Sequence, residues 1–254
     1  MDIMIIGGTD VNARIDLIKR INSKYKVCCV GSSTKIKKDF NLSDIDDFNY
    51  PLPNNYNLLE YFYCFYHLIM IIQKISPNII LTFDTKPNII ARFAAKCCGI
   101  KTVIGTQPGL GIIKRQGGGI FIYFVKIIAK FLTRMVNSIS DLTIYQNSDD
   151  LKYVIKNELI KKNKAKLIIS SGVDTDYFNG ALFKNNESGK DLNVVMISRL
   201  LKSKGVKQYW MLANSINKTH SNVQFHHIGD LDKSHSDSID LSLIHISEPT
   251  RQEA

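Results

Sequence analysis

The chain has 254 residues, and its 44% of hydrophobic and 22% of charged residues exclude an intrinsically disordered protein. Its 33 Lys and Arg against 23 Asp and Glu give a net charge of +10, which indicates a partner that bears phosphate: nucleic acid, nucleotide or an anionic membrane. The five cysteines are odd in number and lie in apolar runs, so they are expected to be reduced core residues rather than a disulfide framework.

Residues 1–8 contain no basic segment and only a short apolar run, so a cleaved signal peptide is not predicted. The longest apolar stretch, residues 58–75, is interrupted by Glu60, His67 and Gln73, whereas a membrane-spanning helix needs about 20 nearly uncharged residues. We therefore predict a cytoplasmic protein in which residues 58–75 form a buried or interface helix.

Short apolar runs alternate with stretches of helical periodicity over residues 1–180. Strands are predicted at 1–6, 25–31, 78–83, 101–106, 142–146 and 166–170, and helices at 11–23, 58–75, 87–98 and 120–137. The Asp- and Asn-rich residues 41–57 are predicted to be a polar loop, and the lysine-rich residues 151–166 a solvated helix. This alternation is typical of a doubly wound parallel sheet, so residues 1–180 are assigned to one Rossmann-like α/β domain.

A second, shorter domain is predicted after residue 191. The apolar periodicity lapses over residues 181–191, which are rich in Asn, Glu, Ser, Gly and Lys and are predicted to be a linker. A strand at 192–197, a helix at 206–217 and a strand at 223–228 follow. These elements predict the start of a second α/β domain over residues 192–240.

Residues 241–251 read Leu-Ser-Leu-Ile-His-Ile-Ser-Glu-Pro-Thr-Arg, which resembles the translation of a transposase adapter used to prepare sequencing libraries. A chance match of this length is very improbable, so residues 241–254 are predicted to be an adapter-derived tail and are excluded from fold reasoning. The alternative is a natural polar tail. The adapter interpretation implies that the second domain is truncated near Asp240.

A glycine pair, Gly7 and Gly8, follows the first predicted strand. Such a turn lets a ligand approach the backbone at a helix N-terminus, where free N–H groups favour an anion. Glycine turns after a first strand are also common for purely structural reasons, so the two interpretations stay open.

Two later predicted strands end in polar or glycine-rich loops, and their candidate residues are Asp84, Thr85, Lys86, Asn88, Gln107 and Gly109. Open α/β sheets bind ligands at the carboxyl ends of their strands, so two such loops at neighbouring strand ends predict a shared crevice. Thr85 and Asn88 also have a structural interpretation, because either could cap the helix that Pro87 opens.

Arg199 and Lys204 lie around a turn at the end of the first strand of the second domain. A guanidinium offers bidentate hydrogen bonds and an ammonium a point charge, and this combination suits a diphosphate. The alternative is a solvated basic turn.

Five motifs resemble, in order, those of glycosyltransferase family 4, and most closely those of its bacterial members that extend lipid-linked sugars for capsule, O-antigen or glycoprotein glycans. They are Asp84-Thr85-Lys86-Pro87-Asn88, Gly109-Leu110-Gly111, Gln146-Asn147-Ser148-Asp149-Asp150, Ser171-Gly172-Val173-Asp174, and Ser198-Arg199 with Lys204-Gly205-Val206. The resemblance extends from Met1 to about Asp232. It implies the GT-B fold, in which two Rossmann-like domains enclose the active site, the first binding the acceptor and the second the nucleotide-sugar donor.

The resemblance also implies roles for the candidate residues. Arg199 and Lys204 are expected to be catalytic, holding the donor diphosphate and stabilising charge on the departing nucleotide. Gly7 and Gly8 are expected to close over the same diphosphate, and the polar residues of the two strand ends to line the acceptor side. The implied reaction retains configuration and needs no metal or cofactor, with a UDP-sugar as the expected donor.

Two departures from the family pattern limit these expectations. Many members have a His where this chain has Pro108, so no residue is assigned that acceptor-side role. The paired glutamates of the C-terminal domain, spaced Glu-x7-Glu, would lie beyond Asp240. The chain as given is therefore expected to lack transferase activity.

Residues 112–136, from Ile112 to Val136, carry cations and no acid among apolar residues; the cations are Lys114, Arg115, Lys126, Lys130 and Arg134. Such a segment suits docking on an anionic inner-membrane surface, where lipid-linked acceptors are found. We therefore predict a cytoplasmic protein peripherally associated with the cytoplasmic membrane. The alternative is an ordinary helix with a solvated face.

Nucleic acid is not a predicted partner, because the basic residues are not interleaved with a stacking platform or a reading motif. No metal site is predicted: His226 and His227 point to opposite faces of a strand, and Cys97 and Cys98 end a helix as core residues. The alternative to an enzyme is a noncatalytic nucleotide- or phosphate-binding module, for which the net charge and the glycine turns would suffice.

Overall fold

The structure is a computed structural model that describes residues 1–9, 11–32, 45–53, 57–115, 117, 119–170, 172–180, 192–231 and 237–239. The chain divides into two compact units, Met1–Phe178 and Asn179–Ala254. The predicted linker at 181–191, the predicted tail at 241–254 and Ser171 of the fourth motif lie outside the described residues.

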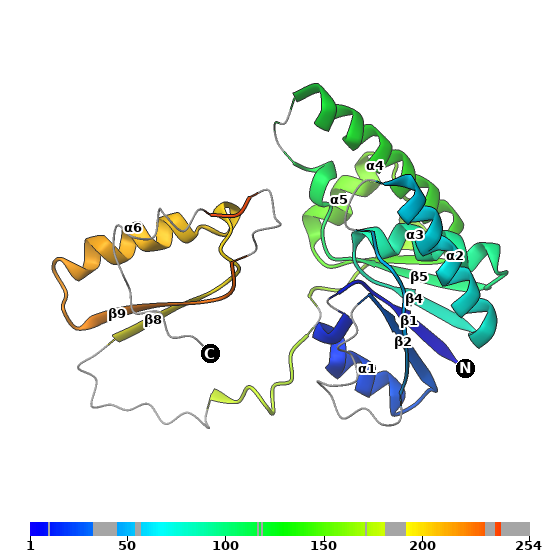
Figure 1. Cartoon of the computed structure of the whole chain (residues 1–254), viewed down its shortest axis with the longest axis horizontal. Helices are drawn as coiled ribbons and strands as arrows, with labels where there is room; N and C mark the ends of the chain where they lie inside the picture. The colour runs from blue at the N-terminus through cyan, green and yellow to red at the C-terminus, as the bar shows by residue number, and fades with distance from the viewer. Residues whose placement is uncertain are drawn as a thin grey trace. The chain divides into compact units, whose positions relative to one another are not determined.

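The described part of the first unit contains one parallel sheet. Its strands are β1 (Ile3–Ile6), β2 (Val27–Gly31), β3 (Asp46–Asn49), β4 (Ile79–Thr82), β5 (Thr102–Gln107), β6 (Leu142–Tyr145) and β7 (Ala165–Leu167). They pair in the order β3-β2-β1-β4-β5-β6-β7. Figure 1 labels β2, β1, β4 and β5, which lie in the middle of this order. The chain therefore builds the sheet outward from β1 in one direction and then, from β4 onward, in the other. This order confirms the predicted doubly wound α/β fold.

Helices cover both faces of this sheet. They are α1 (Ile15–Asn22), α2 (Leu58–Ile75), α3 (Thr85–Cys97), α4 (Gly119–Ile139) and α5 (Ser148–Lys156), with short 3-10 turns η1 (Val11–Arg14), η2 (Gly111–Ile113) and η3 (Lys162–Lys164). The helices α2, α3 and α4 lie side by side on one face, and α1 covers the other (Figure 1). The helices that follow β1 and β4 are thus on opposite faces.

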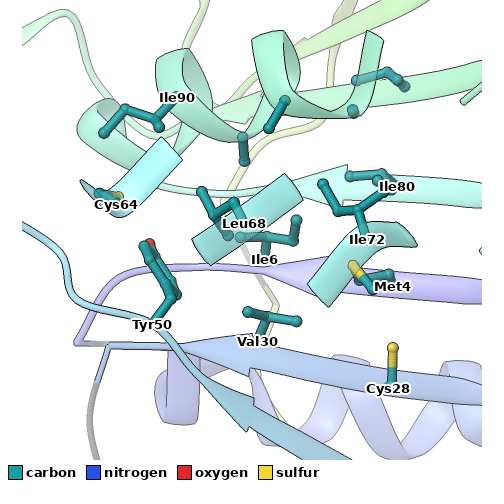
Figure 2. Close-up of a cluster of buried hydrophobic side chains, with 14 residues drawn as sticks. Met4, Ile6, Cys28, Val30, Tyr50, Cys64, Leu68, Ile72, Ile80 and Ile90 are labelled. Carbon is teal, nitrogen blue, oxygen red and sulfur yellow. The ribbon is translucent and has the colours of Figure 1, made fainter. Parts of the chain in front are cut away.

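The main hydrophobic core lies between the sheet and α2. Met4 and Ile6 of β1 point into it, and Cys64, Leu68 and Ile72 of α2 recur every four residues on the inner side of that helix (Figure 2). All five side chains are fully buried. Burying one side chain of this size stabilises a fold by about 1.5–3 kcal/mol, so this stripe fixes α2 on the sheet.

The outer side of α2 is apolar as well, because Leu58, Leu59, Phe62, Tyr63, Tyr66 and Met70 are all exposed. They lie opposite the stripe that begins at Cys64. The predicted buried or interface helix is therefore buried on one face only.

The cysteines follow the prediction with one exception. Burial raises the pKa of Cys28 and Cys29 to about 12 and that of Cys64 to about 11, so these thiols stay protonated in the core. Cys98 is half-buried, but Cys97 is exposed. The prediction of a core role for Cys97 is wrong, because the last turn of α3 turns this side chain outward.

Two other predictions for the first unit are corrected. The strand β3 lies inside the predicted polar loop 41–57; its exposed ends and polar residues gave no strand pattern, and its pairing with β2 supplies the structure. The predicted helix 151–166 ends at Lys156, because Glu158 has a left-handed backbone (φ 54°) and the chain then returns to the sheet as β7.

The second unit contains a small parallel sheet and one helix in its described part. The strands β8 (Leu192–Ile197) and β9 (Val223–Ile228) and the helix α6 (Val206–Asn217) have the predicted bounds, and a short 3-10 turn, η5 (Lys202–Lys204), precedes the helix. A core of Leu200, Val206 and Ile239 lies beneath α6. Val195, Ile197 and Ile228 are exposed.

Candidate functional site

The sheet of the first unit has its topological switch point between β1 and β4. These strands are hydrogen-bonded neighbours, and the helices that follow them, α1 and α3, leave toward opposite faces. Ligands of open α/β sheets bind at such a point, beyond the carboxyl ends of the strands. Gly7 and Gly8 follow β1 here, and Asp84 follows β4.

Asp84 ties the two turns together. Its Oδ2 accepts the backbone N–H of Gly8 at 3.0 Å, and its Oδ1 accepts Nη2 of Arg14 at 2.8 Å. The guanidinium of Arg14 also lies 4.5 Å from the centroid of the Phe83 ring. Asp84 has a φ of 65° and a ψ of 158°, a conformation that costs a residue with a side chain about 1–3 kcal/mol. About a quarter of its side chain is exposed.

Both glycines of the turn after β1 are hydrogen-bonded to side chains of the protein. The N–H of Gly8 is used by Asp84, and the hydroxyl of Tyr50 donates to the carbonyl of Gly7 at 2.9 Å. A Cβ on Gly7 would lie 3.1 Å from Val11, so close packing alone favours glycine there. A phosphate on the Gly8 N–H would have to displace the carboxylate of Asp84.

The other predicted acceptor-side residues fall into two groups. Thr85 is exposed in the first turn of α3, and Nζ of Lys86 donates to the carbonyl of Pro53 at 2.9 Å. Asn88 and Gln107 are 1% and 9% exposed and are bonded to other protein groups. Their side chains are therefore not available to contact a ligand, and they can affect ligand binding only by positioning the backbone carbonyls of Thr106 and Gly109.

Gly109 follows β5 and is half-buried. Its carbonyl accepts Nε2 of Gln107 at 2.6 Å. No side-chain capping bond is made at the start of α3, where Asp84 is the N-cap residue, and Asn88 uses its amide elsewhere. The structural interpretation of Asn88 as a helix cap is therefore not supported.

Sequence reasoning missed Arg14 and Arg92. Arg14 lies in the region that follows the glycine turn and gave no local signal, because its partner Asp84 is 70 residues away. Arg92 could have been noticed as a lone charge in the apolar stretch of α3 from Ile90 to Ala95, and it is fully buried.

The second unit has a pocket of about 540 Å³ at the carboxyl ends of β8 and β9; it is lined by Ile197, Ser198, Arg199, Ile228, Gly229, Asp230 and Leu231. Arg199 is exposed in its wall, and Lys204 is exposed in the turn that follows. Gly229 is required, because a Cβ there would lie 2.0 Å from the carbonyl oxygen of Ser198.

Residues 237–239 hold the loop that carries Arg199 and Lys204. The carboxylate of Asp237 accepts a hydrogen bond from the N–H of Ser203 at 2.8 Å, and the backbone carbonyl of Asp237 accepts one from the N–H of Lys202 at 3.0 Å. The N–H of Ile239 donates to the backbone carbonyl of Leu200 at 3.1 Å. The backbone between Arg199 and Lys204 is thus held by hydrogen bonds at Leu200, Lys202 and Ser203.

No group of three or more His, Cys, Asp or Glu side chains within the described ranges is placed to hold a metal ion. Among the same residues, no helix has the length and apolar character needed to cross a membrane.

Two parallel-sheet units with polar loops at their strand ends define a protein of the GT-B class. The chain belongs to the glycosyl transferase 4-like family, which matches residues 12–141. No curated protein matches the chain by sequence.

Solved structures with the same fold share little sequence with the chain. A glycosyltransferase from Rickettsia africae has a TM-score of 0.63 and 16% identity, over 91% of this chain and 62% of that one. UDP-GlcNAc 2-epimerase from Neisseria meningitidis bound to UDP-GlcNAc has a TM-score of 0.59 and 16% identity, over 91% and 67%. HepE from Anabaena in complex with UDP and glucose has a TM-score of 0.60 and 14% identity, over 91% and 61%. The chain thus spans about two thirds or less of the length of these proteins.

Proposed function

We propose that the chain is the donor- and acceptor-binding part of a retaining glycosyltransferase that moves a sugar from a nucleotide-diphosphate sugar to a lipid-linked or polysaccharide acceptor of the cell surface. The observation that carries the proposal is Arg199 in the wall of a pocket at the carboxyl ends of β8 and β9. Ligands bind at this end of parallel strands. Structures of similar fold hold UDP-GlcNAc, or UDP and glucose, which supports UDP as the nucleotide.

The two cations of this loop suit the chemistry of the donor. The guanidinium of Arg199 can form two parallel hydrogen bonds to a phosphate, and the ammonium of Lys204, in the turn that follows, can supply a point charge. Negative charge grows on the diphosphate as the sugar leaves. Fixed cations that stabilise this charge lower the barrier without a metal ion.

The acceptor is proposed to bind at the switch point of the first unit. Asp84 is held by Gly8 and Arg14, and part of its carboxylate side chain remains exposed. A carboxylate fixed in this way can accept a hydrogen bond from a sugar hydroxyl. Asp84 is therefore the acceptor-side residue that we favour in place of the family's missing histidine.

The first unit is proposed to dock on the cytoplasmic face of an anionic membrane through α4. The exposed large apolar residues of this helix are Ile120, Phe121, Tyr123, Phe124, Ile127, Ile128, Phe131 and Met135. The helix also carries Lys126, Lys130 and Arg134 and no acidic residue of its own, although Glu158 lies 3.9 Å from Arg134. The exposed apolar side of α2 belongs to the same helix layer. Apolar side chains that enter the headgroup region and cations that attract anionic lipids bind such surfaces together.

The donor proposal is tested by NMR titration of the ¹⁵N-labelled chain with UDP. The backbone signals of Ser198, Arg199, Lys204 and Gly229 should shift and saturate, and uridine should produce smaller shifts at these residues. Signals that do not move, or that move only in the first unit, would refute the donor site.

The membrane proposal is tested by cosedimentation with vesicles of phosphatidylcholine, with and without phosphatidylglycerol. Binding should require the anionic lipid and should weaken when Lys126 and Lys130 are replaced by Gln, by about 1 kcal/mol for each Lys. The matched control replaces Lys152 and Lys156 of α5 by Gln and should leave binding unchanged. Equal losses in the two double variants would show that net charge alone is responsible.

A further inference from the structure

Arg92 is a charged residue in the interior of the first unit, and only 1% of it is exposed. Burial lowers the pKa of its guanidinium to about 10, so the group remains protonated at neutral pH. A buried charge is costly unless hydrogen bonds satisfy it. The partners of Arg92 are therefore informative about its role.

These partners include two threonine–asparagine pairs on opposite sides of the guanidinium, and Nη1 also donates to the hydroxyl of Ser140 at 3.5 Å. On one side, Oδ1 of Asn88 accepts Nη2 at 2.9 Å and Nε at 3.2 Å, and it also accepts the hydroxyl of Thr82 at 2.5 Å. On the other side, Oδ1 of Asn137 accepts Nη1 at 3.0 Å and the hydroxyl of Thr143 at 2.9 Å. Arg92 thereby fixes the orientation of both asparagine amides.

The Asn88 side leads to the loop that follows β5. Nδ2 of Asn88 donates to the carbonyl of Thr106 at 2.5 Å and lies 3.4 Å from Oε1 of Gln107. Nε2 of Gln107 then donates to the carbonyl of Gly109 at 2.6 Å. A continuous series of hydrogen bonds thus joins the buried cation to the backbone after the strand end.

The Asn137 side ends in the core. Its Nδ2 donates to the carbonyl of Leu159 at 3.0 Å and to the hydroxyl of Tyr145 at 3.2 Å. Tyr145 is fully buried. This side therefore has a threonine and an asparagine like the other one, but its hydrogen bonds do not lead to the loop that follows β5.

The sequence makes room for this arrangement at one position of β5. A Cβ on Gly105 would lie 1.7 Å from Nη2 of Arg92 and 1.9 Å from its Cζ. Only glycine therefore lets the guanidinium lie against β5 between the two pairs.

We propose that Arg92 is a positioning residue for the loop at residues 108–111, acting through Asn88 and Gln107. The loop follows β5, which is the hydrogen-bonded neighbour of β4, the strand that ends at Asp84. Only the description of this loop as the acceptor side rests on the proposed function. The positioning role itself is a property of the ligand-free chain.

The test compares Thr82→Val with Thr143→Val in the ¹³C,¹⁵N-labelled chain. Both threonines are fully buried, and each variant keeps the side-chain shape but removes one hydroxyl from Arg92 and from one asparagine. Thr82→Val should shift the ¹³C signal of the Gly109 carbonyl and speed hydrogen exchange of the Ile113 N–H, which is bonded to Leu110, at least tenfold. Thr143→Val should leave these signals unchanged. Equal effects of the two variants, or none, would overturn the proposal.

A third variant, Arg92→Lys, keeps the charge but replaces the planar fork by a compact ammonium that cannot span both pairs. It should loosen the loop as Thr82→Val does, and it should have no further effect on the loop in a Gln107→Met background. An equal effect with and without Gln107 would contradict the proposed route. If Arg92→Lys does not fold, the threonine comparison decides alone. No substrate is used, so failure of the glycosyltransferase proposal would leave these readouts unchanged.

Discussion

The carboxylate of Asp84 accepts the backbone N–H of Gly8 over 3.0 Å, although the two residues are 76 positions apart. This contact joins the turn after β1 to the turn after β4 at the point where the strand order reverses. The carboxylate is also paired with Arg14, and the backbone of Asp84 is left-handed. The fold thus holds one acidic side chain in a fixed and strained position where sheets of this kind bind ligands.

Replacing Asp84 by Ala should lower the free energy of unfolding of the first unit by about 1–3 kcal/mol. The Gly8 N–H would lose its acceptor and Arg14, whose side chain is 9% exposed, would lose this carboxylate. Asp84→Asn should cost less, because its amide oxygen keeps an acceptor for the Gly8 N–H. Urea unfolding followed by circular dichroism measures both. An Asp84→Ala variant within about 0.5 kcal/mol of the wild type would show that the contact is not stabilising.

Replacing Gly105 by Ala should destabilise the first unit by about 3 kcal/mol or more, because its Cβ would displace the guanidinium of Arg92 from its bonded position. Gly109→Ala is the matched control. No heavy atom lies within 4 Å of a Cβ at that position, so the change should remain within about 0.5 kcal/mol. Similar losses in the two variants would indicate a general effect of lost glycine and not the contact with Arg92.

The second unit should lose stability below pH 6.5. Burial lowers the pKa of His227 from 6.5, so the folded unit disfavours the protonated imidazole that the unfolded chain accepts. The neutral form of His227 therefore costs the second unit no stability above pH 6.5. The free energy of unfolding falls as the pH drops from 6.5 toward the lowered pKa of His227 in the folded state. Trp210 is the only tryptophan of the chain, and the centroid of its ring lies 6.4 Å from that of the His227 ring. Its fluorescence during urea unfolding therefore reports the unfolding of this unit.

The control for this pH dependence is His227→Gln, which should remove the loss between pH 6.5 and about 5, above the range in which most carboxylates titrate. His220→Gln should retain the loss, because His220 is exposed. A pH profile that is the same in the wild type and in His227→Gln would assign the dependence to another group.

Amides of β8 and β9 should exchange with solvent at least about tenfold faster than amides of β1, β4 and β5. In the described part of the chain, β8 and β9 form a two-stranded sheet with Val195, Ile197 and Ile228 exposed, whereas β1 and β4 lie inside a larger sheet with helices on both faces. Hydrogen exchange read by mass spectrometry compares them directly. Equal protection would show that the second unit is stabilised by interactions outside its described residues.

The sequence predicted correctly those helices and strands whose apolar periodicity is clear along their whole length. The strands β8 and β9 and the helix α6 have the expected bounds, because their apolar periodicity continues to their ends and Gly205, with a φ of 78°, marks the start of the helix. The strand β3 was missed because it is polar and gains its structure by pairing with β2. Tertiary context overrides weak strand propensity at such an edge.

The candidate site was predicted only in part, because local patterns reveal its residues but not their contacts with distant parts of the chain. The polar residues at the strand ends could be found from the sequence, and Asp84 is among them. What each side chain does depends on partners far along the chain: Asp84 contacts Gly8 and Arg14, and Asn88 is held by Arg92. These long-range contacts leave no periodic signal, so the exposed and the buried members of the predicted site could not be separated beforehand.

The central claim is that Arg199 and Lys204 bind the diphosphate of a nucleotide donor, and isothermal titration calorimetry with UDP and with uridine tests it most directly. The wild-type chain should bind UDP at least about tenfold more tightly than uridine, since hydrogen bonds to a charged group contribute about 1.5–3 kcal/mol. Arg199→Ala and Lys204→Ala should each remove most of this preference, and Lys207→Ala, a neighbouring exposed cation on α6, should keep it. Equal affinities for UDP and uridine, or an unchanged preference in Arg199→Ala, would contradict the account.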